Sequence, residues 1–199
     1  FVSANTVIRT HNGALGTDGH HSTGEFRPGP GDAETVFANV KRLIARAQTV
    51  AARHGGLTMF AGCGIHEQLG GHIHFGNVRE TPEMVNTLGK LITVPLRYVS
   101  DTDHRGSYGR LDDTRRQAHG WEYRSPCSWL SHPAVARGVL VISQYVAYRQ
   151  KNAMPMLNTH EELAAFVDGI NHTHAADIRK FKRIVDALRT NAMRLESVE

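Results

Sequence analysis

Gly-Gly-His-Ile-His-Phe-Gly, residues 70–76, is the stretch on which the fold prediction depends. Side chains alternate between the two faces of a strand, so we expect His72 and His74 on one face and Ile73 and Phe75 on the other. The flanking glycines allow a ligand or another backbone to approach the histidines closely. The stretch therefore predicts a short β-strand with one polar face, and the two histidines make it a candidate metal site.

Two other segments repeat this alternation of polar and bulky residues. They are Gly24-Glu25-Phe26-Arg27 and Trp121-Glu122-Tyr123-Arg124. A solvated outer face of an antiparallel sheet would explain any one of the three segments. Together they share carboxylate, imidazole and guanidinium groups, which favours a face that binds metals and phosphates. We therefore expect one antiparallel sheet with Glu25, His72 and Glu122 on the same face.

A second glycine-rich stretch, GTDGHHSTGEFRPGPG, covers residues 16–31. Its Asp18-Gly19 pair predicts a tight turn, in which the Asp18 carboxylate either stabilises the turn itself or binds a ligand. The Pro-Gly exit of the stretch leads into the first predicted helix.

Helical periodicity covers much of the remaining chain. Apolar residues at intervals of three and four predict an amphipathic helix over 33–54, ended by Gly55 and Gly56. Thr81-Pro82-Glu83 is a start signal for a helix toward Tyr98, which Pro95 is expected to kink or end. Further helices are predicted at 133–150, at 160–172 with a Thr159–Glu162 capping box, and at 175–195. The apolar strand side chains are expected to pack on helix 33–54: Phe26, Ile73, Phe75 and Tyr123.

Length and composition exclude several classes of protein. The 199 residues suffice for one domain with a sizeable core, and no apolar stretch approaches the ~20 residues of a membrane helix. Only two cysteines occur, far apart, which argues against a disulfide framework or a thiolate zinc site. The net charge is only +4, and the arginines between Arg105 and Arg124 alternate with acidic residues. This cluster suits a nucleotide triphosphate better than a nucleic-acid duplex.

The order of four motifs resembles a known superfamily. DG...GEFRP, GGHIHFG, RGSYGR and WEYRSP look like the carboxylate-amine ligases, which include glutamine synthetase, glutamate-cysteine ligase and the amidoligases. The phage-type COOH-NH2 ligases, type 2, are the most similar group, and the resemblance covers roughly residues 1–150. It implies an α+β fold with a curved antiparallel sheet of glutamine-synthetase type, helices on its convex face, and a helical C-terminal part.

The resemblance also implies an activity and its cofactors. In this superfamily ATP phosphorylates a carboxylate to an acyl phosphate, and an amine then attacks to give an amide. The expected cofactors are ATP and Mg²⁺, and the expected partners are small-molecule or peptide carboxylate and amine substrates, with neither nucleic acid nor membrane. The expected location is the cytoplasm, which is the host cytoplasm for a phage-encoded enzyme.

Metal ligands follow from the resemblance position by position. His72 and Glu122 would hold the Mg²⁺ that bridges the β- and γ-phosphates, although this ion usually prefers an all-oxygen shell. Asp18 and Glu25 would match the acidic pair that holds a second metal near the amine site. His74 would lie close to the nucleotide.

The arginines have separate implied roles. Arg105 and Arg110 of RGSYGR would neutralise phosphate charge during phosphoryl transfer. Arg124 would clamp the substrate carboxylate in a bidentate contact. Arg115 and Arg116 are expected to be surface residues.

One motif of the superfamily has no match in this chain. In the phage-type enzymes an acidic G-x-D-P-E sequence precedes the region where this chain begins with Phe1. Either an N-terminal strand is lacking, or a partner chain supplies those ligands, or catalysis has been lost; the non-Met start favours the first explanation. We expect one catalytic domain over 1–199, with a core at 1–150 and a helical extension at 151–199 for packing or contact within a homo-oligomer.

Two alternatives to a ligase stay open at this point. One is a metal-dependent hydrolase that uses His72, His74 and Glu122 around a zinc-bound water. The other is a non-catalytic binding or structural protein that retains the fold without the upstream acidic motif.

Overall fold

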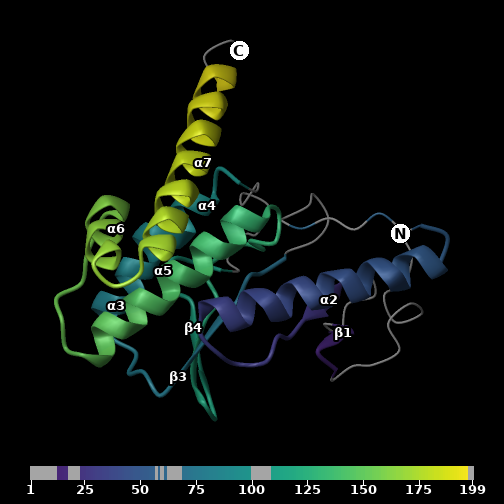
Figure 1. Cartoon of the computed structure of the whole chain (residues 1–199), viewed down its shortest axis with the longest axis horizontal. Helices are drawn as coiled ribbons and strands as arrows, with labels where there is room; N and C mark the ends of the chain where they lie inside the picture. Colours follow the sequence, from purple (N-terminus) through teal and green to yellow (C-terminus); the bar gives the residue numbers. More distant parts are fainter. Residues whose placement is uncertain are drawn as a thin grey trace. The chain divides into compact units, whose positions relative to one another are not determined.

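Figure 1 shows the computed structural model of the chain, which describes residues 13–17, 23–56, 58, 61, 69–99 and 109–196. The chain divides into two compact units, residues 1–60 and residues 61–199. In the described residues each unit combines α-helical structure with antiparallel strands, which confirms the α+β class. The assignment of one catalytic domain with a 1–150 core and a 151–199 extension stays a prediction, and residues 1–12 of that core lie outside the described residues.

The first unit combines a pair of strands with one long helix. Its elements are β1 (Leu15–Thr17), β2 (Gly24–Phe26) and α2 (Ala33–Arg53). The helix begins after Asp32, whose side chain accepts a hydrogen bond from the Thr35 backbone N–H at 2.8 Å. Phe26 packs against Leu15 and the helix residues Leu43 and Ala47. The predicted helix and the packing of Phe26 on it are therefore confirmed.

The second unit contains a three-stranded antiparallel sheet. Its strands are β3 (Ile73–Gly76), β4 (Thr114–Gln117) and β5 (Gly120–Tyr123), in the order β3-β5-β4. Among the described strands β2 pairs with β1 instead, so the prediction that residues 24–27 share this sheet is wrong. The curved sheet of glutamine-synthetase type is not confirmed, since the described strands form only these two small sheets.

The apolar face of this sheet packs on a composite helix. The helix consists of α3 (Pro82–Leu88), the π-helical turn η1 (Gly89–Thr93) and α4 (Val94–Leu96). Tyr123 is fully buried, and its hydroxyl lies 2.8 Å from the Thr93 hydroxyl. Phe75 stacks on Trp121 with a centroid distance of 4.7 Å. The sheet therefore meets η1 through Tyr123.

The predicted start of this helix and its extent toward Tyr98 are confirmed, since the helical stretch ends at Leu96. Thr81 accepts a hydrogen bond from the Met84 backbone N–H at 3.3 Å. Pro95 was expected to kink or end the helix; it lies in the first turn of α4, directly after the π-helical turn η1, and α4 ends one residue later at Leu96. Proline lacks an N–H and crowds the carbonyl four residues back, and the wider π turn accommodates this without a break.

A layer of three further helices completes the second unit (Figure 1). They are α5 (Pro133–Lys151), α6 (His160–Asp168) and α7 (His172–Glu196), whose C-terminal half extends beyond the other two. The predicted Thr159–Glu162 capping box is present. Helix α6 ends before the predicted residue 172, because α7 begins there and the Asn171 side chain accepts the His174 backbone N–H.

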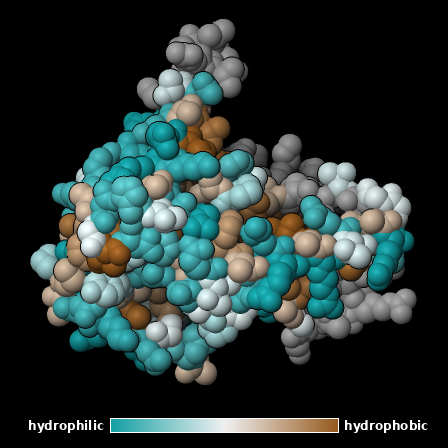
Figure 2. All heavy atoms as spheres, viewed as in Figure 1, coloured by the Kyte–Doolittle hydropathy of each residue, from teal (hydrophilic) through white to brown (hydrophobic). Residues whose placement is uncertain are grey.

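The outer surface of this layer is mainly hydrophilic in the view of Figure 2. Inside it, α5 and α7 approach closely at Gly138, where a Cβ atom would lie 2.4 Å from Cβ of Phe181. None of the helices in the part of the chain that the structure describes is both long and apolar enough to span a membrane.

Candidate metal and substrate site on the three-stranded sheet

Glu122 is the centre of the polar face of the three-stranded sheet. Its side chain is only 1% exposed, and strand register places it opposite His74 on β3 and Arg115 on β4. His72 lies just before β3 on the same face, and its Nδ1 atom is 2.7 Å from Glu122 Oε1. This confirms that His72 and Glu122 share a face and lie close enough to bind one ion.

Two donors from β4 contact the other carboxylate oxygen, Oε2. Arg115 reaches it with Nε at 2.8 Å and Nη2 at 2.7 Å, and Gln117 donates to it from Nε2 at 2.7 Å. Burial alone would raise the pKa of Glu122, but the Gln117 hydrogen bond, the charge of His72 and the Arg115 contact together lower it. The carboxylate is therefore ionised at neutral pH.

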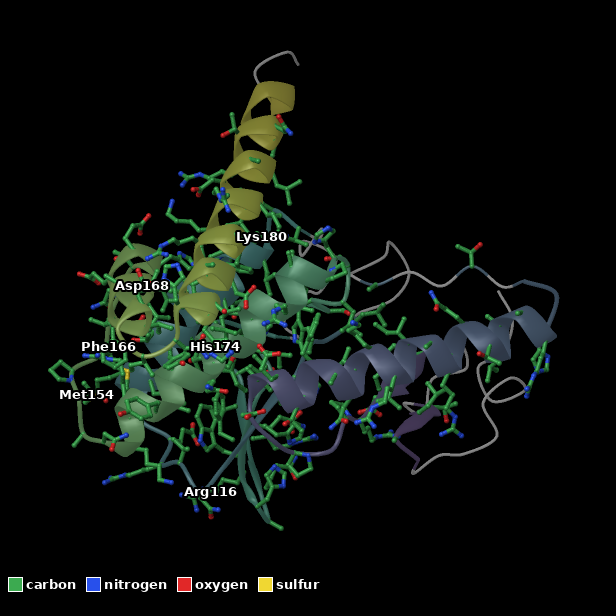
Figure 3. All side chains as sticks on the ribbon, viewed as in Figure 1. Arg116, Met154, Phe166, Asp168, His174 and Lys180 are labelled. Atoms are coloured by element: carbon green, nitrogen blue, oxygen red, sulfur yellow. The ribbon has the colours of Figure 1, made fainter. Side chains whose placement is uncertain are left out.

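This role of β4 was not predicted from the sequence. Arg115 was expected on the surface, and its side chain is indeed 55% exposed, but its guanidinium is bound to Glu122. The four residues of β4 are all polar and show no alternation in the sequence; only the register of β4 with β5 places Arg115 and Gln117 on the Glu122 face. Arg116 lies on the opposite face, near the end of the β4–β5 hairpin that is farthest from α5–α7 (Figure 3).

The Oε1 oxygen of Glu122 has a different environment. It is buried and accepts no well-directed hydrogen bond from the residues that the structure describes, although His72 Nδ1 is close. Arg124 Nε lies 3.7 Å from this oxygen, and Arg124 Nη1 lies 3.7 Å from Asp113 Oδ1. The guanidinium of Arg124 is thus held between two carboxylates on the same face.

The pair His72–Glu122 fits a divalent metal ion. Two ligands bound at right angles, each ~2.1 Å from an ion, lie ~3 Å apart, close to the 2.7 Å separation of Nδ1 and Oε1. Burial lowers the pKa of His72 more than the charge of Glu122 raises it, so the imidazole is neutral, as a metal ligand must be. An ionised carboxylate with one buried, weakly satisfied oxygen completes a two-donor set.

The zinc hydrolase alternative finds no support here. Across residues 13–17, 23–56, 58, 61, 69–99 and 109–196, no three His, Cys, Asp or Glu side chains converge as metal ligands. His74 instead places its Nδ1 atom 3.1 Å from Nε2 of His119, in the β4–β5 turn. The trio of His72, His74 and Glu122 is therefore not a metal-binding group in this structure.

The remaining predicted site residues are less well placed. Glu25 lies on β2 in the first unit and forms an ion pair with Arg27, so its role as a metal ligand stays a prediction. Asp18 and Arg105 lie outside the described residues. Arg110 is exposed in the segment before β4, and its role in phosphate binding stays a prediction.

The glycines before His72 hold the site against the segment that follows β5. Gly70 forms a β-bridge with Cys127, and the Gly71 backbone N–H donates to the Pro126 carbonyl at 2.9 Å. The Trp129 indole N–H donates to the Gly71 carbonyl at 2.9 Å. The glycines were expected to allow a ligand or another backbone to approach closely, and the structure supports the approach of another backbone.

The fold and the site define an α+β protein with a carboxylate, an imidazole and a guanidinium on one sheet face. The family model for phage phiEco32-like COOH.NH2 ligase-type 2 matches residues 1–197. The chain therefore belongs to this family of ligases, which confirms the resemblance and extends it through α6 and α7. Searches among curated proteins and among solved structures gave no match.

Proposed function

We propose that the protein is an ATP- and Mg²⁺-dependent ligase that joins a carboxylate to an amine through an acyl phosphate, on a sheet of glutamine-synthetase type. Membership of the COOH-NH2 ligase family supports the ligase class. The observation that carries the proposal for the cofactors is the 2.7 Å contact between His72 Nδ1 and buried Glu122 Oε1. The proposed substrates are small-molecule or peptide carboxylates and amines, acting in the cytoplasm.

His72 and Glu122 would hold the Mg²⁺ of the nucleotide complex. Mg²⁺ usually takes only one or two protein ligands and completes its shell with water and substrate phosphates, so two donors are sufficient. ATP supplies the phosphoryl group that activates the carboxylate, and the ion neutralises phosphate charge. In this proposal Asp18 and Glu25 contribute to a second metal near the amine.

The arginines would bind the two anionic reactants. Arg124 projects from the end of β5 on the same face as Glu122 and carries the planar fork that matches a carboxylate. We assign the substrate carboxylate to Arg124. Arg110 and Arg105 are assigned to the transferring phosphate, and His74, opposite Glu122, to the nucleotide.

Titration calorimetry with a non-hydrolysable ATP analogue tests the cofactor assignment. The full chain should bind the analogue in the presence of Mg²⁺, and Glu122→Gln should remove the Mg²⁺-dependent part of the binding. Arg116→Gln, on the opposite sheet face, is the matched control and should bind as the wild type does. No detectable binding by the wild type at millimolar analogue would refute the proposal.

Kinetics of two neighbouring substitutions test the roles within the site. Hydroxylamine can replace the amine, so that acyl phosphates from a panel of amino acids and peptides are trapped as hydroxamates. Glu122→Gln should lower kcat, whereas Arg124→Lys should mainly raise KM for the carboxylate, because it keeps the charge but loses the fork. If Arg124 and Glu122 serve only as an internal ion pair, both variants should keep wild-type rates in the molecules that remain folded.

A further inference from the structure

We infer that Gln117 is a positioning residue that fixes the Glu122 carboxylate for metal binding. The inference rests on the proposed function, since it concerns the same metal site. Gln117 lies at the end of β4, and its Nε2 atom donates to Glu122 Oε2 at 2.7 Å. It does not touch Oε1, the oxygen that lies beside His72.

The two oxygens of Glu122 have separate tasks in this arrangement. Oε2 is bound by the donors from β4, whereas Oε1 is buried and has no well-directed hydrogen bond among the described residues. Rotation of the carboxylate would break the β4 contacts and move Oε1 away from His72 Nδ1. The hydrogen bond from Gln117, together with the Arg115 contacts, therefore holds Oε1 2.7 Å from His72 Nδ1, close to the ~3 Å between two ligands of one ion.

We assign the positioning role to Gln117 and not to Arg115 because Gln117 is uncharged. Both contact Oε2, but the guanidinium of Arg115 also repels a cation that binds nearby. Removal of Arg115 would thus have two opposing effects on metal affinity. It would lower the affinity by freeing the carboxylate to rotate, and raise it by removing a repelling charge. Gln117 is neutral, so its loss frees the orientation of the carboxylate without removing a charge that repels the ion.

The chain offers a matched control on the same strand. Thr114 donates from its hydroxyl to the Glu80 carboxylate at 2.7 Å, and alternation along β4 places it on the opposite face. Thr114→Val and Gln117→Met each remove one hydrogen bond to a carboxylate, and both bonds are 2.7 Å long. The two variants therefore differ in whether the affected carboxylate belongs to the site.

Mn²⁺ binding to the full chain, followed by electron paramagnetic resonance without nucleotide, tests the inference. Gln117→Met should weaken Mn²⁺ binding by ~10–100-fold, the usual effect of removing a partner of a metal ligand. Thr114→Val should leave it unchanged, while the Tm of the metal-free protein falls by a similar amount in both variants. Gln117→Ser, which is too short to reach Glu122, should reproduce the loss if the methionine variant folds poorly.

The possible results separate this inference from the proposed function. If the wild type binds no Mn²⁺ at millimolar concentration, the proposed metal site itself is wrong. If the wild type binds Mn²⁺ and Gln117→Met binds it equally well, only the positioning role is overturned. Equal weakening in Gln117→Met and Thr114→Val would also overturn it, because the effect would then be one of general stability.

Discussion

Substitution of Gly71 by alanine tests how tightly the site is held to the segment after β5. A Cβ atom at this position would lie 2.4 Å from the Cys127 carbonyl oxygen and 2.4 Å from Cδ1 of Trp129. Ordinary contacts of these kinds are ~3.5 Å or longer, so the backbone or the indole must move by ~1 Å. Movement of either would weaken the hydrogen bond from Trp129 to the Gly71 carbonyl.

The expected loss of stability follows from these contacts. Insertion of a methyl group into a closely packed region costs ~1–3 kcal/mol, and the weakened hydrogen bond adds at most ~1 kcal/mol. For a chain of this size, each kcal/mol lowers Tm by about 2–4 °C. We therefore expect Gly71→Ala to lower Tm by roughly 2–16 °C, and to displace the adjacent His72.

Thermal unfolding monitored by tryptophan fluorescence measures this effect. Trp129 is one of only two tryptophans, so its displacement should also change the native emission spectrum. Gly76→Ala is the control on β3, because its Cβ would lie 3.5 Å from the nearest atom, the His119 carbonyl oxygen, which is ordinary contact. A Tm for Gly71→Ala as close to wild type as that of Gly76→Ala would contradict the packing argument.

Two further predictions concern the stability of the protein away from the proposed metal site. Burial lowers the pKa of His160, so this side chain binds a proton more readily in the unfolded chain than in the folded protein. The free energy of unfolding should therefore fall as the pH drops below ~6.5. Denaturant unfolding at pH 7.5 and 5.5 should show a smaller fall for His160→Gln than for the wild type. The charged side chains facing this histidine are Glu161, Lys182 and Asp186. Tyr123→Phe removes the hydroxyl that contacts the buried Thr93 hydroxyl and should lower the free energy of unfolding by about 1–3 kcal/mol. Addition of Thr93→Val should recover part of that loss, as measured by urea unfolding. Additive losses would show that the two hydroxyls are not coupled.

The helices could be predicted from the sequence because their signals are local. Periodicity over 33–54 and the Thr159–Glu162 capping box each depend on residues within a few turns, and both were confirmed. Pro95 was expected to kink or end its helix, but the form of the irregularity, the π-helical turn η1 directly before it, could not be predicted. A single π-helical turn cannot be recognised from the spacing of apolar residues in the sequence.

Sheet pairing was less predictable, since it depends on residues far apart in the chain. Alternation correctly placed His72 and Glu122 on one face, but the same alternation in residues 24–27 gave no information on which strand would be their partner. Gln117 was missed because an amide carries no chemical signature of a metal site. Its importance depends on the register of β4 with β5, which fixes its reach to Glu122.

The short β4–β5 hairpin also affects the order in which the site is assembled during folding. Arg115 and Gln117 are seven and five residues from Glu122, so their contacts close only a small loop. His72 is 50 residues away, and its contact with Glu122 requires the ordering of much of the intervening chain. A partly unfolded molecule would therefore lose the histidine while the hairpin still holds the carboxylate with its two donors.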